Sequence, residues 1–249
     1  MTLQGKTIVV IGAGGGLGRA VVSLLLEECA NVVGCDVNIT GLSEFKSNER
    51  FLEYEGNVLD EDTVQDIFKE TFNRFGSVDG LANVLGVAQH ATLIEDCRLA
   101  DYRKIMDVNM TSIFLTCREA AKYMKKQKQG KIVNVGSVSV TRPRPGLQCY
   151  IASKGAVESF SKALALELAP FYINVNVLHP GPSDTGMLGQ FSERGANVDD
   201  TKKTVFEKSV PLGRLLKPAD IAQSVRFLLS DATDMITGAV LHVDGGRNI

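Results

Sequence analysis

Short apolar runs rich in β-branched residues alternate along this chain with longer segments whose apolar residues recur at helical spacing. The runs predicted to form strands are residues 7–11, 31–36, 78–82, 131–135, 172–178 and 239–243. One stripe in the segment that begins at Glu61 follows the spacing i, i+3, i+4, i+7, i+8 and i+11, which predicts a helix packed on a sheet. Its members are Val64, Ile67, Phe68, Thr71, Phe72 and Phe75. Strands that alternate with helices predict βαβ units.

The predicted strands 131–135 and 172–178 are largely apolar on both faces, as in a parallel sheet covered by helices on each side. The sequence therefore predicts an α/β fold with a Rossmann-like, doubly wound parallel sheet. No shift in composition, linker or repeat divides the chain, so we expect a single domain over residues 1–249. The polar, turn-rich insertion at 182–210 is typical of a lid over a site, with a plain surface loop as the alternative.

Composition and charge exclude several classes of protein. The 249 residues include 27 Lys and Arg, 29 Asp and Glu, and 44% hydrophobic residues, which is typical of a globular chain rather than a collagen-like, disulfide-rich or disordered one. A net charge of −2 without a long basic run offers no electrostatic footprint for nucleic acid or anionic lipid. We therefore expect a small-molecule partner, no nucleic acid and no membrane.

The cellular compartment is also an expectation from sequence. The first residues lack the pattern of a signal peptide, and no run approaches the roughly 20 apolar residues of a membrane helix. The five cysteines are odd in number and form no C-x-x-C pair. A reducing cytoplasm is the expected location.

A glycine-rich loop follows the first predicted strand and precedes an apolar helical segment. Gly12, Gly16 and Gly18, with Leu17 between the last two, fit G-x-x-x-G-x-G. Glycines let a backbone approach a pyrophosphate, and a helix N-terminus presents N–H groups and partial positive charge to it. The loop predicts a phosphate cradle, although a glycine loop alone is weak support.

Asp36 ends the second predicted strand, where a carboxylate can accept hydrogen bonds from the adenosine ribose and repel a 2′-phosphate. No Lys or Arg lies between residues 20 and 45. The sequence therefore favours NAD(H) over NADP(H). The alternative interpretation of Asp36 is a solvated side chain at a strand end without a role in binding.

Tyr150 and Lys154 form Y-x-x-x-K at the head of an apolar-periodic segment, so both lie on one helix face. A neighbouring ammonium is expected to lower the pKa of the Tyr hydroxyl toward working pH, as proton exchange with a carbonyl or alcohol oxygen requires. The pattern alone is common on protein surfaces.

In combination, these motifs resemble the short-chain dehydrogenase/reductase family from Thr7 to Gly246. Besides the glycines and Y-x-x-x-K, the matching positions are Asn109, Ser137, Pro180, Gly181, Thr185, and the segment 237–246. The resemblance implies that residues 1–110 mainly bind the cofactor and that residues 130–215 mainly provide catalysis and substrate binding. It also implies a homotetramer in which the helix 101–127 and the helix bearing Tyr150 pair across subunits.

The resemblance assigns roles that fit the chemistry. Tyr150 is expected to be the general acid/base, Lys154 to hold the nicotinamide ribose, and Ser137 to hydrogen-bond the substrate oxygen. Asn109 is expected to support a water that links Lys154 to solvent. The implied cofactor-binding set is Gly12, Gly16, Leu17, Gly18, Asp36, Asn57, Val58, Asn83, Gly86, Tyr150, Lys154, Pro180, Gly181 and Thr185.

Four positions depart from the family pattern. Val84-Leu85 stands where the family usually has Asn-Ala after its fourth strand, Ile11 where it has Thr, and Asn57 where it often has an adenine-contacting Asp. We expect the missing polar groups to loosen cofactor binding slightly.

Candidate substrate contacts come from two loops. His90 follows the fourth strand, and Arg142 and Arg144 lie between Ser137 and Tyr150, where a guanidinium could bind a substrate carboxylate. For His90, a surface or packed position is the alternative. None of the three histidines has the spacing of a metal site, so no metal is expected.

The predicted function is NAD(H)-dependent interconversion of a secondary alcohol and a ketone on a small substrate such as a hydroxy acid, polyol, cyclic alcohol or dihydrodiol. A 3-oxoacyl-thioester reductase is the alternative within the family. A catalytically weak, cofactor-binding regulatory protein is the alternative from a different functional class. A serine hydrolase is disfavoured because no G-x-S-x-G motif is present.

Overall fold

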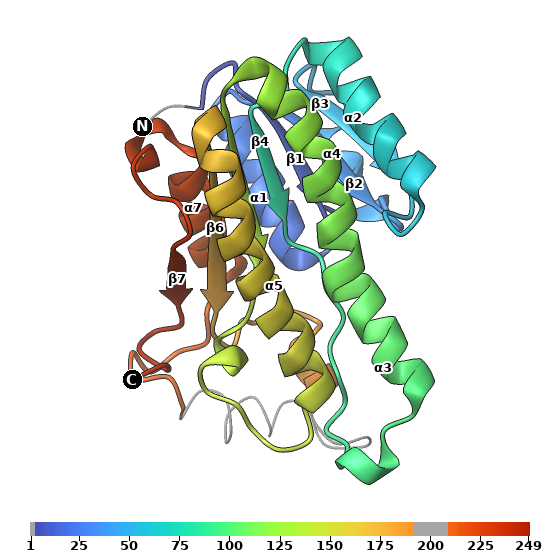
Figure 1. The fold of residues 1–249 in the computed structure, drawn as a ribbon, viewed down its shortest axis with the longest axis vertical. Coiled ribbons are helices and arrows are strands. Elements are labelled where there is room, and N and C mark those ends of the chain that lie inside the picture. Colours follow the sequence, from blue (N-terminus) through green and yellow to red (C-terminus); the bar gives the residue numbers. More distant parts are fainter. Residues whose placement is uncertain (1–2, 192–208) are drawn as a thin grey trace.

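The computed structural model describes residues 3–191 and 209–249 (Figure 1). Within that part of the chain, seven strands form one sheet with parallel neighbours in the order β3-β2-β1-β4-β5-β6-β7. The strands are β1 (Thr7–Ile11), β2 (Asn31–Asp36), β3 (Phe51–Glu55), β4 (Gly80–Asn83), β5 (Gly130–Val135), β6 (Ile173–Pro180) and β7 (Val240–Val243). The predicted Rossmann-like, doubly wound fold is confirmed.

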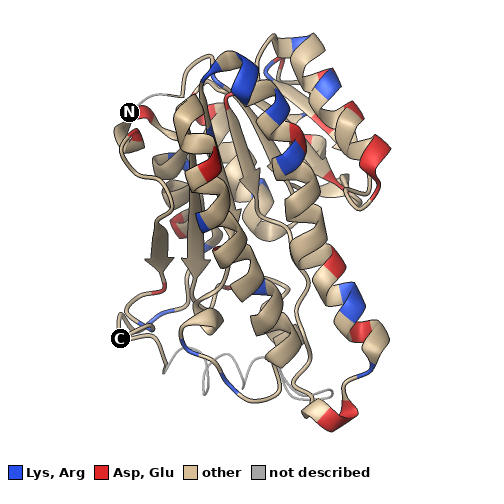
Figure 2. Ribbon diagram, viewed as in Figure 1, with Lys and Arg blue, Asp and Glu red and all other residues tan. Residues whose placement is uncertain are grey.

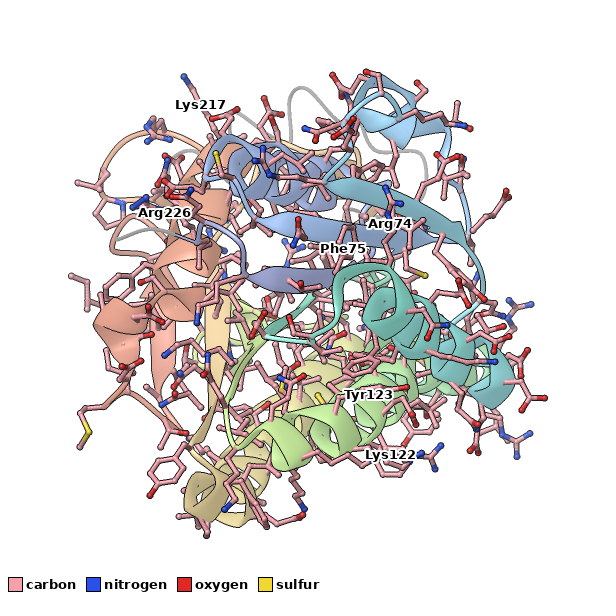
Figure 3. The ribbon with its side chains drawn as sticks, turned by 90° about the horizontal axis from the view of Figure 1, so that it is seen from above. Arg74, Phe75, Lys122, Tyr123, Lys217 and Arg226 are labelled. Carbon is pink, nitrogen blue, oxygen red and sulfur yellow. The ribbon has the colours of Figure 1, made fainter. Side chains whose placement is uncertain are left out.

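Helices cover both faces of the sheet, which explains why its central strands are apolar on both sides. Helices α1 (Gly16–Glu27) and α7 (Pro218–Leu229) pack on one face, and α2 (Glu61–Phe75), α4 (Ser112–Gln127) and α5 (Gln148–Leu168) pack on the other. Figure 3 labels Tyr123 on α4 and Arg226 on α7, which lie on opposite sides of the sheet. Every residue of β1 and β5 is buried between these layers.

Helix α2 follows the stripe that the sequence predicts. The Asp60 side chain accepts a 3.2 Å hydrogen bond from the amide of Asp62 and caps the first turn, and Gly76 ends the helix at φ 79°. Val64, Ile67, Phe68 and Thr71 are buried. Phe72 stands at the edge of the stripe, and its ring lies 5.7 Å from that of Tyr123 on α4.

Strand β3 is absent from the strands predicted from sequence. It is an edge strand that pairs with β2 alone, and only its first residue is fully buried. Because Glu53 and Glu55 interrupt its apolar residues, the run is too short to be recognised as a buried strand.

The helix predicted over 101–127 is three elements. Helix α3 (Leu99–Met106) continues through a π-helical turn at Asp107–Thr111 into α4. An apolar strip on α4 is buried in the core cluster on this face of the chain's own sheet. Its members are Cys117, Ala120, Ala121 and Met124.

The order of the strands positions the site. Because β2 and β4 flank β1 on opposite sides, successive connections diverge above the carboxyl ends of β1 and β4, where doubly wound proteins bind ligands. In Figure 1 these ends are the arrowheads at the lower edge of the sheet. Residues 182–191 of the predicted lid border this edge, whereas residues 192–208 lie outside the described part of the chain.

Charged residues of both signs are interspersed over the ribbon in Figure 2, without an extended region of one sign on the described residues it displays. No helix within residues 3–191 and 209–249 combines the length and the apolar character that crossing a bilayer demands.

Candidate active site

The glycine loop that follows β1 has positions that packing itself restricts to glycine, among them Gly12 and Gly18. Gly12 has a φ of 84°, and a Cβ there would lie 2.7 Å from the Cα of Leu85. A Cβ on Gly18 would lie 2.1 Å from the carbonyl oxygen of Gly12. Gly16 differs, because a Cβ there would lie 3.7 Å from Thr185, an ordinary contact distance. Its missing side chain leaves space between the loop and the segment after β6.

Asp36 lies at the end of β2 against this loop. Its Oδ2 accepts a 3.0 Å hydrogen bond from the amide of Gly14, and its Oδ1 accepts a 3.1 Å bond from the amide of Asn38. A Cβ on Gly14 would lie 2.1 Å from the Asn38 carbonyl oxygen. Gly14 is not among the predicted site residues, yet its size allows the loop and the predicted ribose-binding carboxylate to meet.

The other predicted adenosine contacts follow β3 and β4. Asn57 is exposed and its side-chain oxygen accepts a 3.1 Å hydrogen bond from the amide of Leu59, while Val58 is buried. Asn83 is fully buried: its Nδ2 donates to Asn134 at 2.8 Å, and its Oδ1 accepts from Thr116 at 3.0 Å. Asn83 therefore ties β4 to β5 and α4 within the core.

The apolar pair that replaces the family's Asn-Ala is accommodated by packing. The amide of Val84 donates a 2.9 Å hydrogen bond to the carbonyl of Ile11, which continues the pairing of β4 with β1. Leu85 lies directly against Gly12 and joins the apolar cluster on the α2 and α4 side of the sheet. Backbone pairing and apolar contact thus hold the glycine loop against β4.

A cleft with about 870 Å³ of space, part of it open to solvent, lies at the carboxyl ends of the strands. Nine of the residues predicted to bind cofactor or substrate line it together. They are Leu17, Gly86, Ser137, Arg144, Tyr150, Lys154, Pro180, Gly181 and Thr185. Residues as much as 168 positions apart in sequence (185 − 17 = 168) are brought to one cavity by the parallel order of the strands.

Tyr150 and Lys154 lie in the first turns of α5, as predicted, and Ser137 follows β5. The side chain of Gln89 accepts a 2.9 Å hydrogen bond from the amide of Tyr150 and so satisfies a free donor of the helix N-terminus. The Nζ of Lys154 donates to the carbonyls of Val135 at 2.9 Å and Leu85 at 3.5 Å.

The acidity of these groups differs from the sequence-based expectation. Burial raises the pKa of Tyr150 to about 12, and a hydrogen bond with Ser137 only partly opposes this shift. Burial also lowers the pKa of Lys154 to about 8. The expectation that the ammonium lowers the Tyr pKa is therefore wrong for the protein alone. The Lys154 ammonium points to backbone carbonyls, and the Phe191 ring stands 5.0 Å from the Tyr150 ring and shields it from water.

Asn109 lies in the π-helical turn between α3 and α4. Its Oδ1 accepts a 2.7 Å hydrogen bond from the amide of Val87, and its Nδ2 donates to Ser153 at 3.0 Å. A Cβ on Gly86 would lie 3.3 Å from this Oδ1 and 3.2 Å from the Nζ of Lys154. Asn109, Gly86 and Lys154 therefore meet at one point beside the cleft.

Only some of the residues predicted to contact substrate lie at the cleft. Arg142 and Arg144 line the cleft, whereas His90 is exposed and is not among the described lining residues. The lining residues that were not predicted from sequence include Phe191 and Arg247. Arg247 follows the double glycine after β7, and its place beyond the carboxyl end of a strand is the one signal in the sequence that could have indicated it.

Comparison with known proteins defines the class. A family model described as enoyl-(acyl carrier protein) reductase matches residues 12–248. The 3-oxoacyl-[acyl-carrier-protein] reductase of Thermotoga maritima is 33% identical over 99% of both chains. The 2,3-dihydro-2,3-dihydroxybenzoate dehydrogenase of Bacillus subtilis is 34% identical over 99% of this chain and 97% of that protein.

A solved structure agrees with the sequence relatives. The 3-ketoacyl-(acyl-carrier-protein) reductase of Brucella melitensis, in complex with NADH, has 33% identity, a TM-score of 0.91 and full coverage of both chains. The fold and the relatives define a nicotinamide-dependent oxidoreductase that acts on CH–OH groups. The chain belongs to the short-chain dehydrogenase/reductase family.

Proposed function

We propose that this protein is an NAD(H)-dependent dehydrogenase that interconverts a secondary alcohol and a ketone on a small substrate. The observation that carries the proposal is that Ser137, Tyr150 and Lys154 line one cleft together with Leu17 and Thr185, at the edge where the glycine loop ends. A hydroxyl that can donate a proton, beside the space that a dinucleotide needs, supports the proposal.

The glycine loop fits a dinucleotide. Gly12 and Gly18 keep the loop compact, and the bare Cα of Gly16 faces Thr185 across the space where a pyrophosphate would approach the start of α1. Gly86, Pro180 and Gly181 would flank the rest of the cofactor. When bound, the nicotinamide ring supplies or accepts the hydride.

In this proposal, side chains of the protein donate the proton and stabilise the negative charge that develops on the substrate oxygen. In the reductive direction, the Tyr150 hydroxyl gives its proton to the substrate oxygen, and Ser137 donates a hydrogen bond to that oxygen as negative charge develops. Lys154, whose Nζ is directed to the backbone carbonyls of Val135 and Leu85, would hold the nicotinamide ribose, while Asn109 fixes the backbone beside Lys154. Phe191 and Leu188 help to exclude water from the reacting groups.

The preference for NAD(H) rests on Asp36. Its carboxylate is anchored by the amides of Gly14 and Asn38, and a fixed negative charge there accepts hydrogen bonds from a ribose 2′-OH but repels a 2′-phosphate.

The alternative activity, reduction of a 3-oxoacyl thioester, is favoured by the names of the Thermotoga and Brucella relatives. Asp36 argues against it, because reductive biosynthesis mostly uses NADP(H). The two activities differ in the length and kind of substrate, so an assay with both substrate classes separates them. NADH binding alone does not, because the Brucella 3-ketoacyl reductase was solved in complex with NADH.

The test is titration of the protein with NADH and with NADPH, followed by absorbance at the reduced-nicotinamide band with a panel of secondary alcohols, ketones and 3-oxoacyl thioesters. Tighter NADH binding and turnover that disappears in Tyr150→Phe are expected. Tight NADH binding without turnover on the whole panel would favour the regulatory alternative, and tighter NADPH binding would reject the role given to Asp36.

We also propose a homotetramer in a reducing cytoplasm. All five cysteines are free thiols, and Phe114 on α4 and Leu166 on α5 expose apolar side chains on the two helices that the family resemblance pairs across subunits. Light scattering after gel filtration tests the assembly, and Leu166→Lys is expected to yield smaller species.

A further inference from the structure

Three guanidinium groups border the same cleft as Tyr150. Arg142 and Arg144 come from the segment between Ser137 and α5, and Arg247 comes from the turn after β7, more than 100 residues further along the chain (247 − 144 = 103). The Nη1 of Arg142 donates to the backbone carbonyl of Arg247, which joins the two segments directly.

The described lining of the cleft carries basic side chains without acidic ones. Among the described residues that line it, none is Asp or Glu. Asp244, the nearby carboxylate, accepts 2.9 Å hydrogen bonds from the amides of Gly246 and Asn248, so its two oxygens are directed into its own turn. The Nη2 of Arg144 donates at 2.7 Å to the carbonyl of Phe191, a neutral acceptor.

Of the three guanidinium groups, Arg247 is the one with a buried nitrogen that makes no hydrogen bond to the described residues. Its Nη1 is buried without a hydrogen-bond partner among the described residues. Burial lowers the pKa of Arg247, and the charges of Arg142 and Arg144 lower it further, while Asp244 opposes this shift. A buried, unpaired donor next to two like charges is unfavourable until an anion binds.

We propose that the substrate of this enzyme is a hydroxy acid or oxo acid, whose carboxylate binds Arg247 with Arg142 and Arg144 while its alcohol or ketone carbon faces Tyr150. A planar guanidinium matches a carboxylate with two parallel hydrogen bonds. Leu147, Leu188 and Phe191 also line the cleft and offer apolar surface to the carbon skeleton of a small organic acid. This inference rests on the proposed function and narrows its substrate class.

The experiment measures binding without turnover. Isothermal titration of the NAD⁺-saturated protein uses 2-oxo, 3-oxo and cyclic oxo acids, each paired with its methyl ester, because an oxidised cofactor cannot reduce them. At least one acid is expected to bind 10- to 100-fold more tightly than its ester. This ratio corresponds to the stabilisation that a hydrogen bond to a charged group usually provides. Arg247→Gln is expected to remove most of this difference and Arg247→Lys to retain part of it, with NADH affinity unchanged. Arg98→Gln, an exposed arginine paired with Asp101, is the matched control.

Each other outcome is decisive. If no acid binds better than its ester while NADH binds and a neutral alcohol is oxidised, the anion subsite is rejected and the dehydrogenase stands. If Arg247→Gln weakens NADH and the acid equally, the guanidinium serves the cofactor, which also overturns the proposal. If wild-type protein binds neither NADH nor NAD⁺, the proposed function itself fails. If Arg247→Gln does not fold, Arg144→Gln decides by the same acid-to-ester ratio.

Discussion

The amide of Gly14 donates a 3.0 Å hydrogen bond to the carboxylate of Asp36, so the glycine loop and the predicted ribose-binding group form one unit. The pair joins the end of β1 to the end of β2. Gly14 is restricted to glycine because a Cβ would meet the carbonyl of Asn38 at 2.1 Å. A change at Asp36 therefore affects both the charge that meets the ribose and the shape of the loop.

Replacement of Asp36 separates these two effects. Asp36→Ala is expected to weaken NADH binding about 10- to 100-fold, by the loss of charge-assisted hydrogen bonds, and to weaken NADPH binding less because a repulsive charge is removed. Asp36→Asn keeps one acceptor oxygen for the loop and should shift the same preference with less loss of stability. Fluorescence titration with both cofactors measures the ratio. An equal loss for NADH and NADPH would mean that Asp36 acts only through the loop.

The glycines of the loop are expected to respond differently to the same change. Gly18→Ala forces a Cβ to 2.1 Å from the Gly12 carbonyl and should destabilise the fold by about 2 kcal/mol or more. Gly16→Ala meets only Thr185 at 3.7 Å, so the melting temperature without cofactor should be preserved while NADH affinity falls at least tenfold. Gly186→Ala, with no atom within 4 Å of the new Cβ, is the control. Unchanged NADH affinity in Gly16→Ala would reject the phosphate cradle.

The sequence predicts the layers and most strands because their signals are local. Strands such as β1 and β5 are largely apolar runs, and the stripe of α2 repeats over about three turns. Strand β3 escapes prediction because an edge strand buries little and needs few apolar residues. The π-helical turn at Asp107–Thr111 changes the hydrogen-bond pattern without changing the apolar spacing that a sequence displays.

The site is predictable only where its residues belong to motifs. Tyr150, Lys154 and Ser137 share one cleft as expected, whereas Arg247 and Phe191 are placed there by long-range folding that no local pattern encodes. The acidity of Tyr150 does not follow from the i, i+4 spacing to Lys154. The Nζ of Lys154 binds the Val135 carbonyl, and burial dominates the pKa of the hydroxyl.

Removal of the Tyr150 hydroxyl is expected to stop turnover without disturbing the cofactor site. Tyr150→Phe should lower kcat about 10²- to 10⁴-fold, the usual contribution of a positioned general acid, and should leave NADH affinity within a factor of two. The phenyl ring that remains in this variant can keep the edge contact with Phe191, so the melting temperature serves as the folding control. A kcat within tenfold of wild type would assign the proton transfer to another group.

Stability is expected to fall below neutral pH because of His179 on β6. Its side chain is fully buried, its Nε2 lies 3.5 Å from a carboxylate oxygen of Glu158, and its ring lies 5.1 Å from that of His242. Burial lowers the pKa of His179 from 6.5 to about 4, against the opposing charge of Glu158. At a pH between these two pKa values, the histidine is protonated in the unfolded chain but neutral in the native protein. The free energy of unfolding therefore decreases as the pH falls.

A pH of 5 lies 1.5 units below the ordinary histidine pKa (6.5 − 5 = 1.5). The free energy of unfolding is therefore expected to be about 2 kcal/mol lower at pH 5 than at pH 7.5. Urea denaturation at the two pH values measures this loss in wild type and in His179→Gln, which cannot take up the proton. The variant is expected to be less stable at pH 7.5 through altered packing but to lose about 2 kcal/mol less on acidification. His90→Gln, at an exposed histidine, should keep the wild-type pH dependence. If His179→Gln keeps it as well, the acid sensitivity arises from carboxylates instead, and His179 takes up its proton equally in the native and the unfolded protein.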